Sequence, residues 1–586
     1  MRGFFKIVFA TLIALVLFTV IGIFVLIGII SSAASSDKPT IGSKAVLVLN
    51  LDQPFKEQHQ EDPFATFLND NEDDVPSLSE TILLINHAKT DTSIKCLYIQ
   101  CADNANGFAT SEEIRKAILS FKKSGKYVLA YGEVISQKGY YIGSAADAIY
   151  CNPQGGVDWD GFSTNMVFLK GMLDKLEIQP QVFYAGKFKS ATEPLRATQM
   201  TDANKLQTGV WLGELYTHFI STTSASRKKD STEFRNLALN GSIRTAFDAK
   251  HYGLVDGLKY DDEIKSILLK KLSQEEKVKI NFVSLGDYKA AVEYNKTGDS
   301  KVALVFASGD IVSGNGSNDQ VGSDNFKNLL RKIRLDKDIK AVVFRVNSPG
   351  GSALASEVIW RELQLMKKEK PVVVSMGDVA ASGGYYIACN ADSVFANANT
   401  ITGSIGVFSI VPNMQSFFKN KIGVTFDGVK TAPYADMGGI DKPLNDFEKH
   451  FFQSSVDSIY HTFKTRVSNG RKKSMDNVDS LAQGRVWTGT HAIKNGLVDR
   501  IGTLEDAIEC AVRMAKIKNS DYKLREYPEK KSILDQIMSG YKKSISEKLI
   551  STQIGIDELN LLKELKELKQ MKGVPQAKMP FLITVN

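Results

Sequence analysis

The chain has 586 residues, of which 43% are hydrophobic and 24% are charged, and its formal net charge is +7. This length is more than one hydrophobic core normally supports, so a globular protein of two or more domains is expected. The charge is small for the length, and the lysines are interleaved with acidic residues. That pattern favours a solvated surface over a nucleic-acid interface, and no nucleic acid is expected as a partner.

An uncharged apolar stretch, IVFATLIALVLFTVIGIFVLIGII, occupies residues 7–30. As a helix it is long enough to cross a bilayer. Arg2 and Lys6 precede the stretch, and Asp37 is the first charged residue after it. The positive-inside rule therefore predicts that the N-terminus is cytoplasmic and that most of the chain lies outside.

A cleaved signal peptide is the alternative, because residues 31–36 (SSAASS) are small enough to be cut. The apolar core of a signal peptide is normally about 7–15 residues, however, and this one is longer. We therefore expect an uncleaved membrane anchor over residues 1–32 and a linker over residues 33–43.

Four segments of the chain recur further along it. The pairs are 44–51 with 301–307, 94–99 with 339–344, 132–147 with 377–392, and 253–256 with 496–499. The first residues of these pairs are separated by 257, 245, 245 and 243 positions. Such a nearly constant separation predicts two tandem copies of one domain, over residues 44–298 and 299–523, followed by a lysine-rich tail over residues 524–586. The extra residues of the first copy fall around an acidic stretch, 57–74, which is expected to be a surface insertion.

Each copy alternates short β-branched runs with amphipathic helical patterns. In the second copy we expect strands at 341–346, 371–375 and 393–396, and helices at 353–368, 384–391 and 445–467. This alternation indicates βαβ units and a largely parallel sheet, that is, an α/β fold. In the tail, residues 557–573 have the pattern of an amphipathic helix. Such a helix either packs on its own domain or a neighbour, or lies on a membrane surface.

Ser382 stands between a predicted strand and a predicted helix, directly before two glycines. This placement exposes a hydroxyl at a helix start, where backbone N–H groups favour negative charge. An enzyme that forms an acyl-serine through an oxyanion needs such an arrangement, although a lone Ser-Gly-Gly is more often a packing feature. In the first copy the equivalent residue is Gln137, followed by Lys138.

A second glycine motif, NSPGGS, follows a strand at residues 347–352, and it can present bare backbone N–H groups to an oxyanion. The first copy has ADNANG at residues 102–107, without paired glycines. The second copy thus holds a candidate nucleophile and a candidate oxyanion loop, and the first copy has lost both.

The sequence offers lysine rather than histidine as the base for this serine. The seven histidines lie outside the glycine-rich motifs, and the five cysteines lack zinc-ligand spacing, so no metal is expected. Lys189 (GKFKSATEP) and Lys430 (GVKTAP) occupy equivalent places in the two copies. Either lysine taken alone is usually a solvated surface residue. To act as a base, its pKa must be lowered by burial or by nearby positive charge.

The anchor, the two copies, and the motifs KSATEP, NSPGG, ASGGYYIA and TGSIGV in this order resemble the long form of bacterial signal peptide peptidase A, also called protease IV. The resemblance covers almost the whole chain after the anchor. It implies two tandem domains with the fold shared by Clp protease and crotonase, and a serine–lysine dyad formed between the copies.

Matched onto this chain, the resemblance makes Ser382 the nucleophile and Lys189 the base. Ser404 matches the serine that orients the lysine amine. Gly351 and Gly383 match the backbone donors of the oxyanion hole, and Gly350 is the alternative in the loop. The same resemblance selects Lys189 over Lys430, which would face Gln137 in the family's head-to-tail ring.

The function implied is that of a membrane-anchored serine endopeptidase that degrades hydrophobic peptides, chiefly cleaved signal peptides, without a metal or other cofactor. Its implied location is the extracytoplasmic side of the bacterial inner membrane, as a homotetramer. Two alternatives stay open. A crotonase-like acyl-CoA enzyme would share the fold, although an external location argues against it, and a catalytically dead membrane scaffold would need no nucleophile.

Overall fold

The computed structural model describes residues 40–58, 75–295, 297–518, 521–529 and 573–579, together with scattered positions between 3 and 22. Among these residues no helix is both long enough and apolar enough to span a bilayer. Residues 23–39 lie outside the described residues, so the predicted anchor is only partly covered, and the linker is covered only at residues 40–43. The helix predicted at 557–573 also lies outside them, apart from its last residue. The domain boundaries stay a prediction.

The first repeat is built on a six-stranded sheet in the order β6-β4-β3-β2-β1-β7, in which every pairing is parallel. Its strands are β1 (Ala45–Asn50), β2 (Ile94–Gln100), β3 (Tyr127–Ile135), β4 (Ala148–Val157), β6 (Gly257–Leu258) and β7 (Phe282–Ser284). Alternate residues of β1 point to opposite faces of the sheet. Leu47 packs in the hydrophobic core on one face, and Val46 packs in the core on the other face. Burial on both faces explains why the strands are almost continuously apolar.

The second repeat has the same strand order, β18-β14-β13-β11-β8-β19, again with parallel pairings. Its strands are β8 (Ser300–Ser308), β11 (Ile339–Ser348), β13 (Val372–Ala381), β14 (Ser393–Ala396), β18 (Arg500–Ile501) and β19 (Tyr522–Tyr527). Two equivalent sheets confirm the predicted duplication and the α/β fold. The strand predicted at 371–375 is longer than expected and runs to the residue before Ser382.

Helices cover both sheets, and their bounds are as follows. In the first repeat they are α2 (Leu78–Ala88), α3 (Phe108–Lys122), α4 (Gln137–Gly143), α5 (Lys170–Lys175), α6 (Glu193–Arg196), α7 (Asp202–Arg227), α8 (Ser231–Leu239), α9 (Ala246–His251), α10 (Asp261–Lys271) and α11 (Leu285–Ala291). In the second they are α12 (Ser323–Leu335), α13 (Ala353–Met366), α14 (Gly383–Ala388), α15 (Asp446–Arg471), α16 (Met475–Leu481), α17 (Gly489–Lys494) and α18 (Leu504–Met514). The predicted helices at 353–368, 384–391 and 445–467 correspond to α13, α14 and α15.

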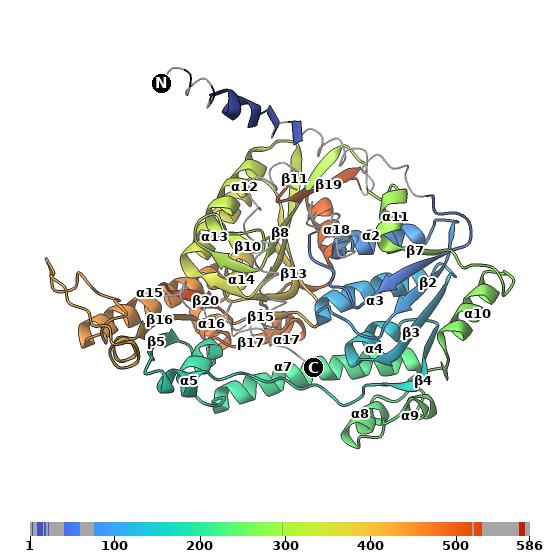
Figure 1. Ribbon diagram of the computed structural model, residues 1–586, viewed down its shortest axis with the longest axis horizontal. Coiled ribbons are helices and arrows are strands. Elements are labelled where there is room, and N and C mark those ends of the chain that lie inside the picture. The colour runs from blue at the N-terminus through green and yellow to red at the C-terminus, as the bar shows by residue number, and fades with distance from the viewer. Residues whose placement is uncertain are drawn as a thin grey trace.

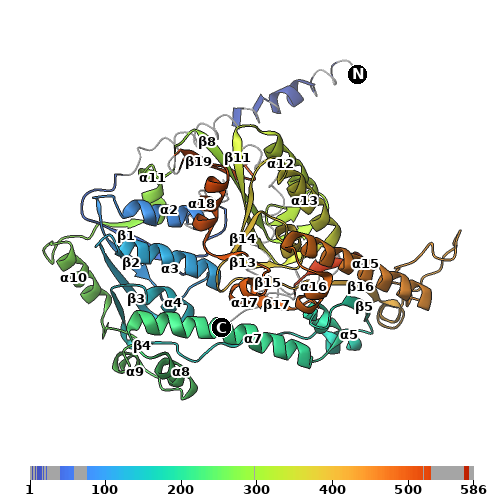
Figure 2. The same cartoon turned by 180° about the vertical axis from the view of Figure 1, so that it is seen from behind.

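Helix α7 ties the repeats together, because it runs along the base of both halves (Figures 1 and 2). Its Trp211 and Leu215 pack in one buried cluster with Ala381 and Ile401 of the second repeat. Two short strands of the second repeat, β15 (Ile401–Gly403) and β17 (Val486–Thr488), lie at this contact. The first repeat therefore supports the end of the strand that leads to Ser382.

A third, mixed sheet has the order β10-β9-β12-β20-β16-β5. Its strands are β5 (Gln179–Ala185), β9 (Asp310–Val312), β10 (Gln320–Gly322), β12 (Gly350–Ser352), β16 (Val407–Asn413) and β20 (Gln576–Lys578). β5 belongs to the first repeat and pairs antiparallel with β16 of the second, from Val407 opposite Ala185 to Asn413 opposite Gln179. Because of this pairing, the residues that follow β5 in the chain lie against the second repeat.

A buried ionic cluster also joins the repeats. The Arg345 side chain is completely buried and lies 2.9 Å from Glu57 and 2.8 Å from Glu113, both in the first repeat. Burial by itself lowers the pKa of Arg345, but the two carboxylates more than offset this and hold it above its ordinary value. The expectation that the acidic stretch is a surface insertion is thus wrong at its first residue, because Glu57 is needed to neutralise a buried arginine.

Candidate active site

Ser382 lies between β13 and α14 in a backbone conformation that is rare for a residue with a side chain. Its φ is 55° and its ψ is −113°. Such a conformation costs about 1–3 kcal/mol and persists only where the surroundings enforce it. Here the Ser382 N–H donates to the Gly403 carbonyl (2.8 Å), and the Ser382 carbonyl accepts from the Tyr386 N–H (2.8 Å). Gly403 of strand β15 and the first turn of helix α14 together hold the serine in the turn.

The equivalent turn of the first repeat is relaxed. Ser136 has an ordinary φ of −66° there and caps α4 through its side chain, and Gln137 is the first residue of the helix. The Gln137 side-chain amide donates a hydrogen bond to the Gly161 carbonyl (2.8 Å) and accepts one from the Gly161 N–H (3.0 Å). Strain at this turn is therefore confined to the repeat that carries the serine.

Lys189 reaches Ser382 from the first repeat. Its Nζ lies 2.9 Å from Ser382 Oγ and 3.2 Å from both the Oγ and the carbonyl oxygen of Ser404. The lysine is 1% exposed, and burial lowers its pKa to about 7. At neutral pH about half of such lysines carry no proton, so this amine can accept the proton of the serine hydroxyl.

The backbone of Lys189 is fixed by residues that the sequence analysis did not identify. A Cβ on Gly484 would lie 2.7 Å from Lys189 Cα, so only glycine allows this close approach. Gln207 of α7 donates to the Phe188 carbonyl (3.0 Å) and to Ser190 Oγ (3.1 Å), on either side of the lysine. Neither residue lies in a recognisable motif, and only the crossing of β5 onto the second repeat brings them to the site.

The glycine loop meets the start of α14 at one point. A Cβ on Gly350 would lie 2.6 Å from the Gly383 nitrogen, and a Cβ on Gly351 would lie 2.0 Å from the Ile311 carbonyl oxygen. The φ angles of Gly350 (99°) and Gly351 (154°) are also in the region that favours glycine. The Gly350 N–H donates to Ser348 Oγ (3.2 Å), so the geometry favours Gly351 as the loop's oxyanion donor.

Lys430 is not brought to the serine. Its side chain is 43% exposed and pairs with Asp436 at 2.8 Å. It belongs to the segment after β16, which projects from the body of the molecule (Figure 1). Of the two lysines left open by the residues alone, the structure brings only Lys189 to Ser382.

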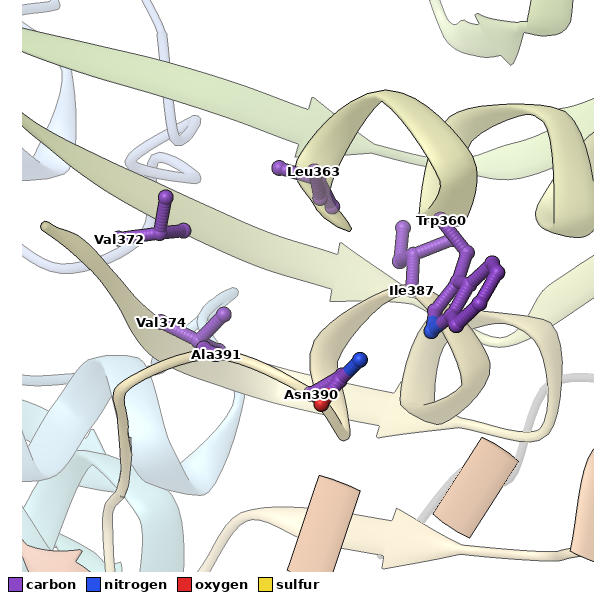
Figure 3. A pocket seen from close by; sticks show the side chains of 7 residues that line it. All are labelled: Trp360, Leu363, Val372, Val374, Ile387, Asn390 and Ala391. Atoms are coloured by element: carbon purple, nitrogen blue, oxygen red, sulfur yellow. The ribbon is translucent and has the colours of Figure 1, made fainter. Parts of the chain in front are cut away.

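A small apolar pocket lies between α13, β13 and α14 (Figure 3). It is lined by Trp360, Leu363, Val372, Val374, Ile387, Asn390 and Ala391. Of the predicted site residues, none is in this lining, and the side chains around it are those of the hydrophobic core. We assign it no role in the chemistry.

Comparison with known proteins identifies the family. The profile of Peptidase family S49 matches residues 120–273 and 364–518, once in each repeat, and the Clp protease profile matches residues 295–402. The chain belongs to peptidase family S49. Because the matches fall on both repeats, the predicted resemblance to the long, tandem-repeat form is confirmed.

Several curated relatives of this S49 peptidase match most of its length. It is 36% identical to Protease 4 of Salmonella typhi over 81% of this chain and 77% of that protein. It is 35% identical to Protease 4 of Haemophilus influenzae over 90% of this chain and 89% of that protein. It is also 33% identical to the chloroplastic serine protease SPPA of Arabidopsis thaliana, over 84% of this chain and 72% of that protein.

Proposed function

We propose that this S49 peptidase is a serine endopeptidase with a Ser382–Lys189 dyad. The observation that carries the proposal is the 2.9 Å separation between Lys189 Nζ and Ser382 Oγ, for a lysine whose pKa is lowered to about 7 by burial. Ser404 is a positioning residue in this scheme, because its hydroxyl and carbonyl oxygens each lie 3.2 Å from the Lys189 amine. The acyl-CoA alternative has no observation in its favour, and membership of a peptidase family speaks against it.

The reaction has two halves. Neutral Lys189 accepts the hydroxyl proton as Ser382 Oγ attacks the peptide carbonyl, and the N–H groups of Gly351 and Gly383 stabilise the oxyanion. The protonated lysine then gives its proton to the leaving amine. A water molecule, deprotonated by the same lysine, hydrolyses the acyl-serine and restores the hydroxyl.

The proposed substrates are hydrophobic peptides, chiefly signal peptides left in the membrane after cleavage. The apolar stretch at residues 7–30 would anchor the enzyme beside them, with both repeats on the extracytoplasmic side of the bacterial inner membrane. Membrane extraction tests this part of the proposal. Detergent should release the protein from membranes, whereas salt or alkali should not.

A homotetramer is the proposed assembly. In the first repeat, β5 crosses to the next repeat in the same chain. The equivalent segment of the second repeat, around Lys430, has no strand partner among the described residues of its own chain, and it exposes Val424 (42%), Phe426 (51%) and Val429 (102%). Pairing of this segment with the first repeat of a neighbouring chain would cover these side chains and close a ring. Replacing Phe426 and Val429 with aspartate should give monomers by light scattering.

The dyad is tested by hydrolysis of a fluorogenic hydrophobic peptide. Ser382→Ala and Lys189→Met should each lower kcat/KM by at least about a thousandfold, since the loss of either group removes the nucleophilic step. Lys430→Met is the matched control and should retain parental activity in the assembled protein. Equal rates for the parent and both site variants would refute the proposal.

Co-assembly distinguishes the source of the lysine. Chains with Ser382→Ala and chains with Lys189→Met are refolded together. A dyad within one chain predicts no recovery of activity, whereas recovery would place the two groups on different chains.

A further inference from the structure

Glu193 is a buried carboxylate that the proposed mechanism does not use. It is the first residue of α6, four positions after Lys189, and it is 2% exposed. A carboxylate is costly to bury unless its oxygens accept hydrogen bonds. Glu193 accepts them from the Thr201 hydroxyl (2.5 Å), the Thr201 N–H (3.2 Å) and the Asn204 side-chain amide (2.9 Å). All three donors lie at the start of α7, so the carboxylate fastens the segment that carries the base to this helix.

The same helix holds the backbone of the base one turn further on. Asn204 Oδ1 lies 3.2 Å from Gln207 Nε2, and Gln207 is 3% exposed. Gln207 Nε2 donates to the Phe188 carbonyl (3.0 Å) and to Ser190 Oγ (3.1 Å), in the residues directly before and after the base. A chain of hydrogen bonds therefore runs from the buried carboxylate through α7 to both neighbours of the base.

The other end of the Gln207 amide reaches the second repeat. Its Oε1 accepts from the Val486 N–H of β17 (3.3 Å). The preceding residue, Arg485, accepts from the Ser404 N–H through its carbonyl (2.7 Å). One side chain thus contacts both the backbone beside the base and the strand that holds Ser404. Its two ends keep these parts of the site at a fixed separation.

The equivalent helix of the second repeat, α15, is capped in another way. Its N-cap, Asn445, is bonded to Glu448, the third residue of the helix itself. The third residue of α7 is Asn204, and its capping carboxylate comes from outside the helix. At the position of Gln207, six residues after the cap, α15 has Phe451, which is 48% exposed. The contacts that distinguish the two helices are therefore the ones that lead to the base.

We infer that Glu193, Asn204 and Gln207 are positioning residues, which set the reach of the Lys189 amine to Ser382. The inference rests on the proposed function and deepens it. The three residues act through the backbone on either side of the lysine, because their hydrogen bonds go to its neighbours and to α7. A displacement of about 1 Å at a catalytic group lowers the rate about a hundredfold.

The same contacts keep the amine away from water. Burial is what lowers the pKa of Lys189 to about 7. A lysine whose backbone shifts admits water around the amine, and water favours the ammonium form. Loss of these contacts should therefore raise the pH at which the enzyme becomes active, in addition to lowering its rate.

Gln207→Met tests the inference, because methionine has a similar length but no amide, and the change alters no charge. The assay is hydrolysis of the fluorogenic peptide between pH 5 and 10.5. At pH 7, kcat should fall about a hundredfold with KM within about twofold of the parent. The midpoint of the pH profile should rise by about one unit from its value near 7. Lys205→Met, at an exposed position of the same helix, is the matched control and should keep the parental rate and midpoint.

Glu193 provides a second pair of variants at the other end of the chain of contacts. Glu193→Leu removes both acceptor oxygens and should show the same loss of kcat and the same upward shift of the midpoint. Glu193→Gln keeps an oxygen that can accept from Thr201 and Asn204, so it should retain most of the activity. Both variants are uncharged at this position, and the difference between them reports the hydrogen bonds.

The outcomes separate this inference from the proposed function. Parental rates and midpoints in the folded variants Gln207→Met and Glu193→Leu would overturn the inference. A loss of equal size at every pH would also overturn it, because partial unfolding reduces the amount of active enzyme without moving the midpoint. In both cases the dyad stands if Ser382→Ala is inactive. If Ser382→Ala hydrolyses the peptide as fast as the parent, the proposed function itself is refuted.

Discussion

Replacing Ser404 with aspartate should move the pH dependence of catalysis without removing either member of the dyad. Ser404 Oγ lies 3.2 Å from Lys189 Nζ, and its φ of 50° is in a region that Asp and Asn tolerate well. The parent's kcat/KM should rise with pH as the lysine loses its proton, with a midpoint near 7. A carboxylate this close to an ammonium raises the pKa of the amine by about 1–3 units.

The expected magnitude follows from the fraction of neutral lysine. With a shift of about two units, the midpoint moves to about 9, and the neutral fraction at pH 7 falls from about one half to about 1%. Activity at pH 7 should therefore fall about fiftyfold and return above pH 9. Ser404→Asn is the matched control: it has the same shape without the charge, so its midpoint should stay near 7.

The assay is kcat/KM for a fluorogenic peptide between pH 5 and 10.5, measured on the parent and both variants after their melting temperatures have been checked. Identical midpoints for the Asp and Asn variants would show that residue 404 does not face the catalytic base. A parental midpoint above 9 would show that burial does not lower the pKa of Lys189, and the proposed mechanism would then lack a base at neutral pH.

Three further predictions concern the loop, the interface and stability. Gly351→Ala should lower kcat/KM about 10²–10³-fold, because a methyl group there displaces the oxyanion donor, whereas Gly213→Ala on the open face of α7 should have no effect on the same assay. Arg345→Met should cost about 3–5 kcal/mol by leaving two buried carboxylates unpaired, measured as a fall in melting temperature; an unchanged value would mean that the cluster is solvated. Lys189→Met should stabilise the protein at pH 7 by up to about 5 kcal/mol, since the parent must bury a lysine that prefers to be charged. The unfolded parent binds more protons than the folded parent between pH 7 and 10.5, so this advantage should shrink as the pH rises and vanish near 10.5; a constant difference in thermal melting across that range would contradict it.

The fold and the central residues could be predicted because they leave local patterns. Buried parallel strands are continuous apolar runs, and two copies of one domain repeat those runs at fixed spacing. The turn at Ser382 needs small residues beside it, and the glycine loop needs paired glycines, so both appear as short motifs. The family resemblance then selected Lys189 from two equivalent lysines that the residues alone could not separate.

What could not be predicted depends on pairings between distant segments. Gly484 is required only because the backbone of Lys189 passes within contact distance of it, and no local pattern signals that approach. Glu57 is the first residue of an acidic stretch, so it has the pattern of a surface residue, and only the position of Arg345 explains its burial. The segment 576–578 is short and polar at both ends, and it becomes a strand because two sheet edges lie on either side of it.

The crossing of β5 onto β16 has a consequence for the order in which the enzyme is made. A ribosome finishes the repeat that contains Lys189 before it finishes the repeat that contains Ser382, and neither repeat alone contains both groups of the proposed dyad. With the proposed dyad, the nascent polypeptide therefore has no proteolytic activity until both halves have been synthesised. On this mechanism, proteolytic activity arises only after β16 has paired with β5, so the completion of folding is the event that activates the enzyme.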